Sequence, residues 1–131
     1  MNMKRMMSVS VAAAGAALVL SLTGGAAGPA CDPDNGGLEL PQGFCAAVVA
    51  DNVGPARHLV VAPNGDLFVS TRNAGRGGVG GVVALHDSDG DGKMDTREKF
   101  GADGATGIAL RNGYLYFATT SSIIRYKMTA G

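Results

Sequence analysis

The chain has 131 residues, with 11 basic and 11 acidic side chains and a formal net charge of zero. This balance, without any run of Lys and Arg, excludes the strongly basic surface typical of nucleic-acid-binding domains. A hydrophobic share of 46% with 21 glycines and no tryptophan indicates a small domain with a modest core.

The N-terminal segment has the order of regions that a signal peptidase recognises. Lys4 and Arg5 precede an apolar run that begins at Val11, and small residues follow at 24–28. The run is shorter than the ~20 residues that a membrane-spanning helix needs, so we expect no stable membrane span. Residues 1–30 are therefore predicted to be a cleaved signal peptide, and the mature chain is expected to be periplasmic or secreted, in a bacterium.

The end of the signal leaves alternatives open. Cleavage after Ala27 and cleavage after Ala30 both satisfy the small-x-small rule. Lipid attachment at Cys31 is a further alternative, although Gly28 stands where a lipoprotein signal has an aliphatic residue. A retained membrane anchor is the alternative to cleavage itself.

The two cysteines, Cys31 and Cys45, both lie at the start of the predicted mature chain. In an oxidising compartment an even pair is typical of a disulfide. A short loop closed in this way contributes about 3 kcal/mol in the chain-entropy model. We therefore predict a disulfide between Cys31 and Cys45, with two unpaired small apolar residues as the alternative.

Short apolar runs separated by turn residues follow Cys45. The runs are rich in β-branched and aromatic residues, which is typical of strands, and none has the spacing of an amphipathic helix. The predicted strands cover residues 46–50, 59–62, 67–70, 82–85, 107–110, 114–118 and 123–126. The mature chain is therefore predicted to be all-β.

Two of the predicted hairpins resemble each other. Their turns contain Asn64–Gly65 and Asn112–Gly113, pairs whose tolerance of positive φ suits a tight turn. The flanking segments 59–69 and 107–117 align, and a third strand follows each hairpin. Short strands that repeat every 40–50 residues are typical of β-propeller blades.

The repeat predicts a partial β-propeller over residues 31–131, with blade 1 at about 55–100 and the start of blade 2 at about 104–131. Because a propeller closes with about four to eight blades, the chain is expected to be the N-terminal piece of a longer protein. Two blades alone would leave strand edges unpaired, which favours association. Two unrelated hairpins in a small β-sandwich are the alternative.

The most specific motif is the twelve-residue segment 87–98. Carboxylates stand at positions 1, 3, 5, 9 and 12 and Gly92 at position 6, as in a calcium-binding loop. Carboxylates this close repel one another without a cation. The predicted calcium ligands are Asp87, Asp89, Asp91, the carbonyl of Lys93, Asp95 and Glu98. Because a strand precedes the loop, the ion is expected to be structural; a solvated acidic turn is the alternative.

Further segments suggest a family. Residues 40–44 and 55–72, with the acidic loop, resemble the first blade of the soluble quinoprotein glucose/sorbosone dehydrogenases, and residues 104–110 and 123–126 resemble their second blade. The resemblance implies a six-bladed propeller that binds pyrroloquinoline quinone (PQQ) on its axis. It also implies a sugar substrate, hydride transfer from the sugar to the quinone, and an electron acceptor as partner.

The resemblance implies cofactor-binding roles for two residues. Arg72 matches an arginine that ends the second strand of the first blade, and Asp103 lies near the segment that approaches the quinone. Ala102 stands where glucose-oxidising members have a glutamine, which favours the sorbosone-like branch. The histidine base of the family lies on a later blade, beyond Gly131, so no catalytic residue is expected in this chain.

Three functions follow as hypotheses. The first is the N-terminal fragment of a PQQ-dependent sugar dehydrogenase, and the second is a non-catalytic, exported calcium-binding propeller module for carbohydrate or protein. The third is a secreted calcium-binding β-domain complete at this length. His58 and His86 are expected to be structural, because neither has the neighbouring partner that nucleophilic chemistry requires.

Overall fold

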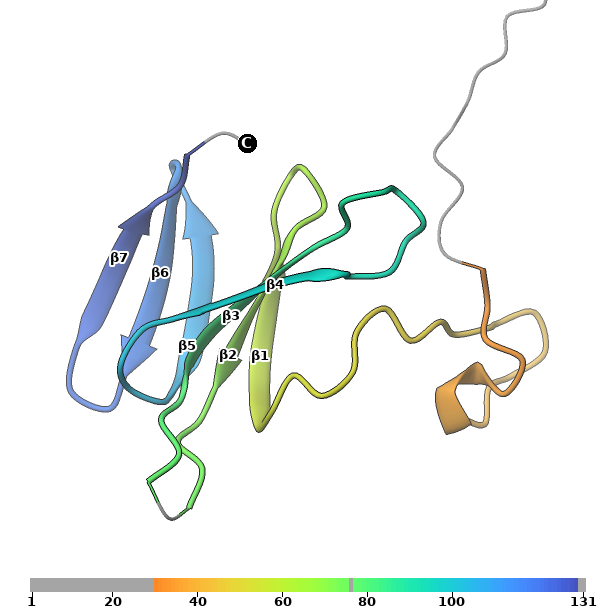
Figure 1. Ribbon diagram of the computed structural model, residues 1–131, viewed down its shortest axis with the longest axis horizontal. Helices are drawn as coiled ribbons and strands as arrows, with labels where there is room; N and C mark the ends of the chain where they lie inside the picture. The colour runs from red at the N-terminus through yellow and green to blue at the C-terminus, as the bar shows by residue number, and fades with distance from the viewer. Residues whose placement is uncertain (1–29, 76, 130–131) are drawn as a thin grey trace, which may run out of the picture.

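The structure, a computed structural model, describes residues 30–75 and 77–129 (Figure 1). Except for Ala30, the predicted signal peptide lies outside these residues. The described residues form one 3-10 turn and seven strands: η1 Asn35–Gly37, β1 Ala56–Val61, β2 Leu67–Thr71, β3 Gly81–His86, β4 Thr96–Phe100, β5 Ala105–Arg111, β6 Tyr114–Thr119 and β7 Ile123–Lys127. Within the described part of the chain, no helix has the length and apolar character needed to cross a membrane.

The strands form two antiparallel sheets in which each strand pairs with its neighbours in the sequence. Sheet 1 has the order β1-β2-β3-β4, and sheet 2 has the order β5-β6-β7. The all-β prediction is therefore confirmed. Consecutive antiparallel pairing needs only short connections, which agrees with the turn residues between the apolar runs.

Both predicted Asn-Gly hairpins form. Asn112 and Gly113 have φ values of 49° and 75° and join β5 to β6 directly, whereas Gly65, with φ of 94°, lies in a longer connection between β1 and β2. The first strand of each hairpin also contains a register irregularity near its start. The two hairpins thus share a bulge as well as a turn sequence.

Two parts of the strand prediction are wrong. Residues 46–50 are not a strand; they run irregularly beside the acidic loop, where the amide of Met94 donates to the carbonyl of Val49. Conversely, β4 was not predicted, because its Thr-Arg-Glu-Lys-Phe sequence has no alternation of apolar and polar residues. It is a largely exposed edge strand paired with β3 alone, and charged side chains are usual at such edges.

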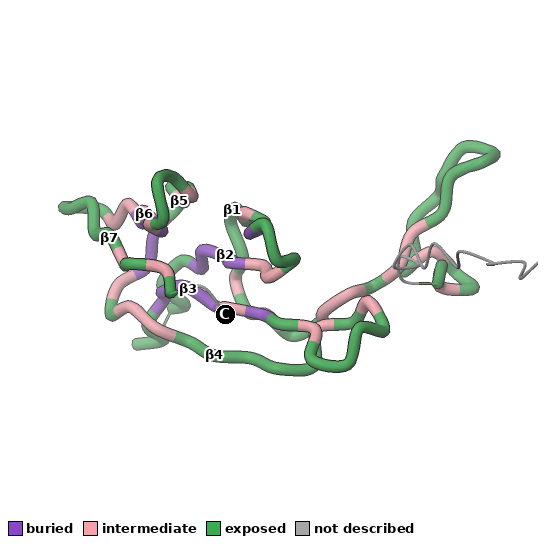
Figure 2. The backbone as a smooth tube through the Cα atoms, turned by 90° about the horizontal axis from the view of Figure 1, so that it is seen from above, coloured by how far each residue is buried: buried purple, intermediate pink, exposed green. Residues whose placement is uncertain are grey.

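The main core lies between the two sheets. Phe68 and Val82 of sheet 1 pack with Leu115 and Phe117 of sheet 2, and the last three of these are fully buried. Figure 2 shows the buried stretches gathered on β2, β3 and β6. Because a fully buried side chain of this size contributes about 1.5–3 kcal/mol, this interface is the main apolar contribution to the fold.

The opposite face of sheet 1 has a smaller core. Val69, Val83 and Leu85 are buried there, and Ala50 and Val53 of the N-terminal segment pack against them. The guanidinium of Arg97 donates to the carbonyls of Asp51 and Asn52 at 2.7 and 3.0 Å. The segment around Ala50 and Val53 therefore covers this face of sheet 1.

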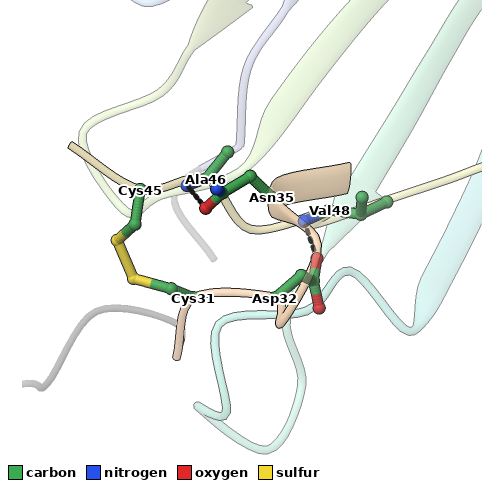
Figure 3. Close-up of a disulfide and its surroundings, with 6 residues drawn as sticks. All are labelled: Cys31, Asp32, Asn35, Cys45, Ala46 and Val48. Carbon is green, nitrogen blue, oxygen red and sulfur yellow. Dashed lines mark hydrogen bonds between the residues drawn. A yellow bond between two sulfur atoms is a disulfide. The ribbon is translucent and has the colours of Figure 1, made fainter. Parts of the chain in front are cut away.

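The predicted disulfide between Cys31 and Cys45 is present (Figure 3). Inside the loop that it closes, the amide of Asp32 donates to the carbonyl of Ala46 at 2.8 Å. The amide of Ala46 donates in turn to Asn35 Oδ1 at 3.2 Å. We refer to residues 31–45 as the disulfide loop.

Replacing both Cys31 and Cys45 with serine is expected to unfold the disulfide loop and leave the sheets intact. The disulfide restricts the unfolded chain and thereby stabilises the loop by about 3 kcal/mol. The hydrogen bonds of the loop are local and cannot replace this stabilisation. Native-state amide hydrogen exchange should show loss of protection at Asp32 and Ala46. Equally faster exchange in β2 and β3 would contradict a local role.

Candidate functional site

The acidic loop connects β3 to β4 and is organised by its own carboxylates. Asp87 accepts hydrogen bonds from the amides of Gly90 and Gly92, both at 2.8 Å, while Asp91 accepts one from the amide of Lys93 at 2.7 Å. Gly90 and Gly92 have φ values of 79° and 86°. Glycine suits this left-handed backbone, which turns the chain so that the carboxylates point inward.

Three of the predicted ligands converge. Asp87, Asp89 and Asp91 each offer a carboxylate oxygen, and these atoms lie within 4.8 Å of one another. Calcium binds oxygens at 2.3–2.6 Å, so two of its ligands lie at most about 5 Å apart. The spacing therefore fits a calcium ion, and the hard oxygen donors suit it.

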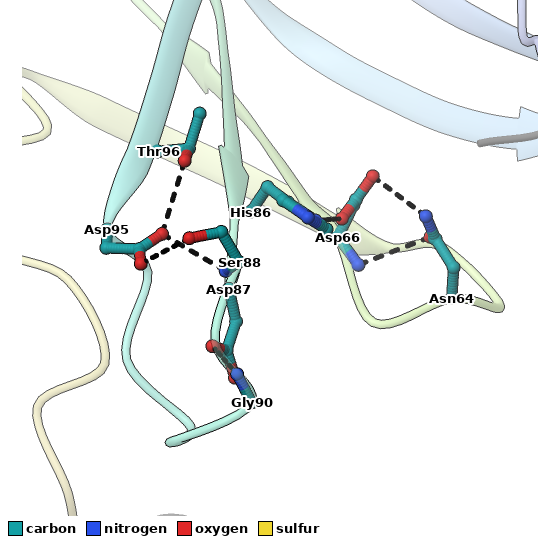
Figure 4. Close-up of polar contacts among 8 residues, drawn as sticks. All are labelled: Asn64, Asp66, His86, Asp87, Ser88, Gly90, Asp95 and Thr96. Atoms are coloured by element: carbon teal, nitrogen blue, oxygen red, sulfur yellow. Dashed lines mark hydrogen bonds and ion pairs between the residues drawn. The ribbon is translucent and has the colours of Figure 1, made fainter.

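Asp95 and Glu98 lie outside this group. Asp95 lies across the loop, where it accepts hydrogen bonds from the hydroxyl of Ser88 at 2.6 Å and from the hydroxyl of Thr96 (Figure 4). Glu98 is already within β4, opposite Ala84 of β3. Lys93 contributes its amide to the hydrogen bonds of the loop.

Two carboxylates of the loop, Asp87 and Asp95, favour their charged form. The amide of Gly92, and then that of Gly90, lower the pKa of Asp87 below its ordinary value of 3.8. The hydroxyl and amide of Ser88 lower the pKa of Asp95 in the same way. Because calcium binds deprotonated carboxylates, the loop is ready to bind it at neutral pH.

A histidine fastens the base of the loop to the first hairpin. His86 Nδ1 lies 2.6 Å from Asp66 Oδ1, and the side-chain amide of Asn64 donates to the same carboxylate at 2.9 Å (Figure 4). The hydrogen bond to Asp66 raises the pKa of His86 above 6.5. Burial raises the pKa of Asp66, but the hydrogen bonds from His86 and Asn64 outweigh it and the pKa falls below 3.8. The structural role predicted for His86 agrees with this geometry.

The segments that carry the two residues expected at the quinone lie side by side at the other end of sheet 1. Arg72 follows β2, and the side-chain amide of the next residue, Asn73, donates to Asp103 Oδ1 at 2.9 Å. Asn73 Oδ1 in turn accepts the amide of Gly80 at 2.7 Å. Arg72 and Asp103, far apart in the sequence, therefore belong to one cluster.

This cluster borders a hollow of about 400 Å³ between the ends of the two sheets. Its lining residues are Arg72, Asn73, Gly104, Ala105, Thr106, Gly107, Ala118, Thr119 and Thr120. Asp103 is not among them, but it accepts the hydrogen bond from the side chain of Asn73. The hollow offers one cation and several hydroxyl and amide groups, a set that suits a polar ligand with acidic groups.

Gly104 is required where the two sheets meet. A Cβ at this position would lie 2.1 Å from the amide nitrogen of Asn73. Nearby, His58 Nδ1 lies 2.8 Å from the carbonyl oxygen of Thr106, and the hydroxyl of Ser70 donates to the same oxygen at 3.2 Å. His58 therefore joins the sheets, as its predicted structural role requires. Sequence reasoning missed Asn73 and the threonines, which carry no motif.

No protein-family model, curated protein or solved structure matches this chain.

The pair formed by His86 and Asp66 gives stability a defined pH dependence. Because folding raises the pKa of His86, its charged form stabilises the fold fully below about pH 6.5, and this contribution is lost as the pH rises through the raised pKa. Because folding lowers the pKa of Asp66, its charged form stabilises the fold above about pH 3.8, and this contribution is lost in acid. Replacing His86 with glutamine should therefore lower Tm more at about pH 5.5 than at about pH 8.5. Thermal unfolding in a calcium chelator measures this; a larger loss at the higher pH would contradict it.

Proposed function

We propose that this chain is the calcium-binding N-terminal part of an exported β-propeller of the soluble quinoprotein sugar dehydrogenase type. The observation that carries the proposal is the cluster of Arg72, Asn73 and Asp103 beside the hollow. Arg72 and Asp103 both hold positions for which the family resemblance implies contact with the quinone. The hydrogen bond from Asn73, the residue after Arg72, to Asp103 brings their segments together.

The architecture supports the blade interpretation. Each sheet is a meander of consecutive antiparallel strands, and the sheets pack face to face through Phe68, Val82 and Phe117. Blades of a propeller have this organisation and this kind of contact. The shared turn and bulge of the two hairpins support a structural repeat.

The hollow has the groups that a quinone with carboxylates needs. The guanidinium of Arg72 would bind a carboxylate of PQQ, and Thr106, Thr119 and the amide of Asn73 would orient its oxygens. A volume of about 400 Å³ lies in the range of cofactor pockets. When bound, PQQ supplies the electron-accepting ortho-quinone to which a sugar transfers hydride.

The described part of this chain supplies binding groups for such a reaction. His58 Nδ1 bonds to the carbonyl of Thr106 and His86 Nδ1 bonds to Asp66, so both imidazoles are held by contacts within the fold. Under this proposal the chain binds the quinone without oxidising sugar, and the base belongs to a later blade.

Calcium would fasten the connection between β3 and β4. Asp87, Asp89 and Asp91 would hold the ion, and their mutual repulsion would be replaced by attraction to it. The convergence of these carboxylates also favours a second candidate function, a non-catalytic exported calcium-binding module for carbohydrate or protein. Calcium binding without quinone binding would distinguish this candidate from the first.

Replacing Asp89 with asparagine is expected to weaken calcium binding about tenfold, because a ligand loses its charge while its size is kept. Isothermal titration of the exported chain, with an expected Kd of about 10⁻⁴–10⁻³ M, measures the effect. Asp51→Asn is the matched control, since this carboxylate lies outside the loop. Equal heats for the parent chain and Asp89→Asn would exclude the loop as the binding site.

Replacing Arg72 with glutamine is expected to weaken PQQ binding about tenfold, since a charge-assisted hydrogen bond is lost. The absorbance change of PQQ on titration with the calcium-loaded chain gives the affinity. Arg57→Gln is the control, because Arg57 is exposed on β1 and does not line the hollow. If the parent chain leaves the PQQ spectrum unchanged, the quinone part of the proposal is wrong and the calcium module remains.

A further inference from the structure

Three asparagines of this chain are followed directly by glycine: Asn35, Asn64 and Asn112. Such an asparagine can react with its own backbone, because the amide nitrogen of the next residue can close a small ring with the side-chain carbonyl carbon. Glycine permits this approach best, since it has no Cβ beside the attacking nitrogen. Asparagine is accordingly one of the thermolabile residues of proteins. The three pairs share one chemistry, so their contacts in the fold decide which of them reacts.

The fold engages both reacting groups of the first pair. Asn35 Oδ1 accepts a hydrogen bond from the amide of Ala46 at 3.2 Å (Figure 3). The nitrogen that would attack, that of Gly36, donates to Asp34 Oδ1 at 3.1 Å. Ring closure at Asn35 therefore requires these hydrogen bonds to break inside the disulfide loop.

The second pair is held in the same way. Asn64 Nδ2 donates to Asp66 Oδ2 at 2.9 Å, and Asn64 Oδ1 accepts the amide of Asp66 at 3.3 Å (Figure 4). The amide of Gly65 donates to the carbonyl of Ala62 at 2.9 Å. Because Asp66 also bonds to His86, the side chain of Asn64 has a fixed partner.

The third pair differs from the other two. Asn112 and Gly113 form the exposed turn between β5 and β6 (Figure 1). The amide of Met128 donates to the carbonyl oxygen of Gly113 at 2.8 Å, but this oxygen takes no part in ring closure. Within residues 30–75 and 77–129, no hydrogen bond holds the side chain of Asn112 or the amide nitrogen of Gly113. Asn64 is exposed as well, so the difference lies in contacts and not in exposure.

We propose that Asn112 is a site of spontaneous covalent modification in the folded chain. The nitrogen of Gly113 loses its proton to a base in solution and attacks Cγ of Asn112. The new C–N bond displaces the side-chain nitrogen, which takes up a proton and leaves as ammonia, and a cyclic imide remains. Water then opens the imide. Opening at the side-chain carbonyl leaves aspartate, and opening at the backbone carbonyl leaves isoaspartate, without oxidation or reduction.

The two products have different effects on the hairpin. Aspartate tolerates the φ of 49° at position 112, so it retains the turn. Isoaspartate carries the backbone through its side chain and adds a methylene between Arg111 and Tyr114, which pair directly across the hairpin. Farther along β6, Leu115 and Phe117 are fully buried, and burial fixes their register. The isoaspartate form is therefore expected to lose the end of the hairpin without a shift of the whole strand.

Neither calcium nor quinone takes part in this reaction. The hollow is lined by the start of β5 and the end of β6, at the opposite end of the hairpin from the turn. Failure of this inference would therefore leave the proposed function untouched.

Mass-spectrometric mapping of the chain after incubation in warm, mildly alkaline buffer tests the site. Position 112 is expected to convert at least about tenfold faster than positions 35 and 64, where hydrogen bonds must break first. In denaturant the three positions should convert at similar rates, since the contacts of Asn35 and Asn64 are then absent. A folded chain that converts Asn35 or Asn64 as fast as Asn112 would overturn the proposal. So would conversion of Asn112 in denaturant alone.

Two matched variants assign the ammonia that is released. Asn112→Gly removes the reacting side chain and keeps a turn that two glycines also suit, so it should abolish most of the release from the folded chain. Asn64→Gly is the control and should leave the release nearly unchanged. The reverse result would place the reaction in the first hairpin.

A third variant separates the effects of the two products. Asn112→Asp supplies the aspartate form directly and should keep the amide protection of Arg111 and Tyr114 in hydrogen exchange. The isoaspartate fraction of the aged chain should lose it. Equal protection in both forms would show that the turn accommodates the added methylene and would overturn the expected effect on the hairpin.

Discussion

The arrangement of this molecule depends on the close approach of two backbones where sheet 1 meets sheet 2. A Cβ at Gly80 would lie 2.4 Å from the Cα of Gly104, and a Cβ at Gly104 would lie 2.1 Å from the amide nitrogen of Asn73. Only glycine allows both contacts, since real Cβ atoms do not come this near to backbone. The same approach lets Phe117 reach Phe68 and Val82, so the glycines and the core between the sheets require each other.

The candidate quinone site is a consequence of this approach. Asn73 bonds both to the amide of Gly80 and to Asp103, and it does so because the two glycines leave room for it. Arg72 is held at the rim of the hollow by its place next to Asn73. A side chain at Gly104 would therefore disturb the core contact and the polar cluster together, which links the stability of the fold to the shape of the proposed site.

Much of the fold could be predicted from the sequence because its signals are local. Asn112 and Gly113 form the expected hairpin turn, and the apolar runs form strands. β4 could not be found, because an exposed edge strand needs no apolar alternation. Residues 46–50 are apolar without forming a strand, and Ala50 among them packs against sheet 1 without joining its hydrogen-bond ladder. Asn73 was missed because its partners depend on the packing of the sheets, which no local pattern reveals.

The acidic loop and the disulfide loop are connected by backbone and not by charge. The segment between them is bound to the acidic loop through Met94 and Arg97, which hold the carbonyls of Val49, Asp51 and Asn52. An ion in the acidic loop would thus stiffen the base from which the disulfide loop projects.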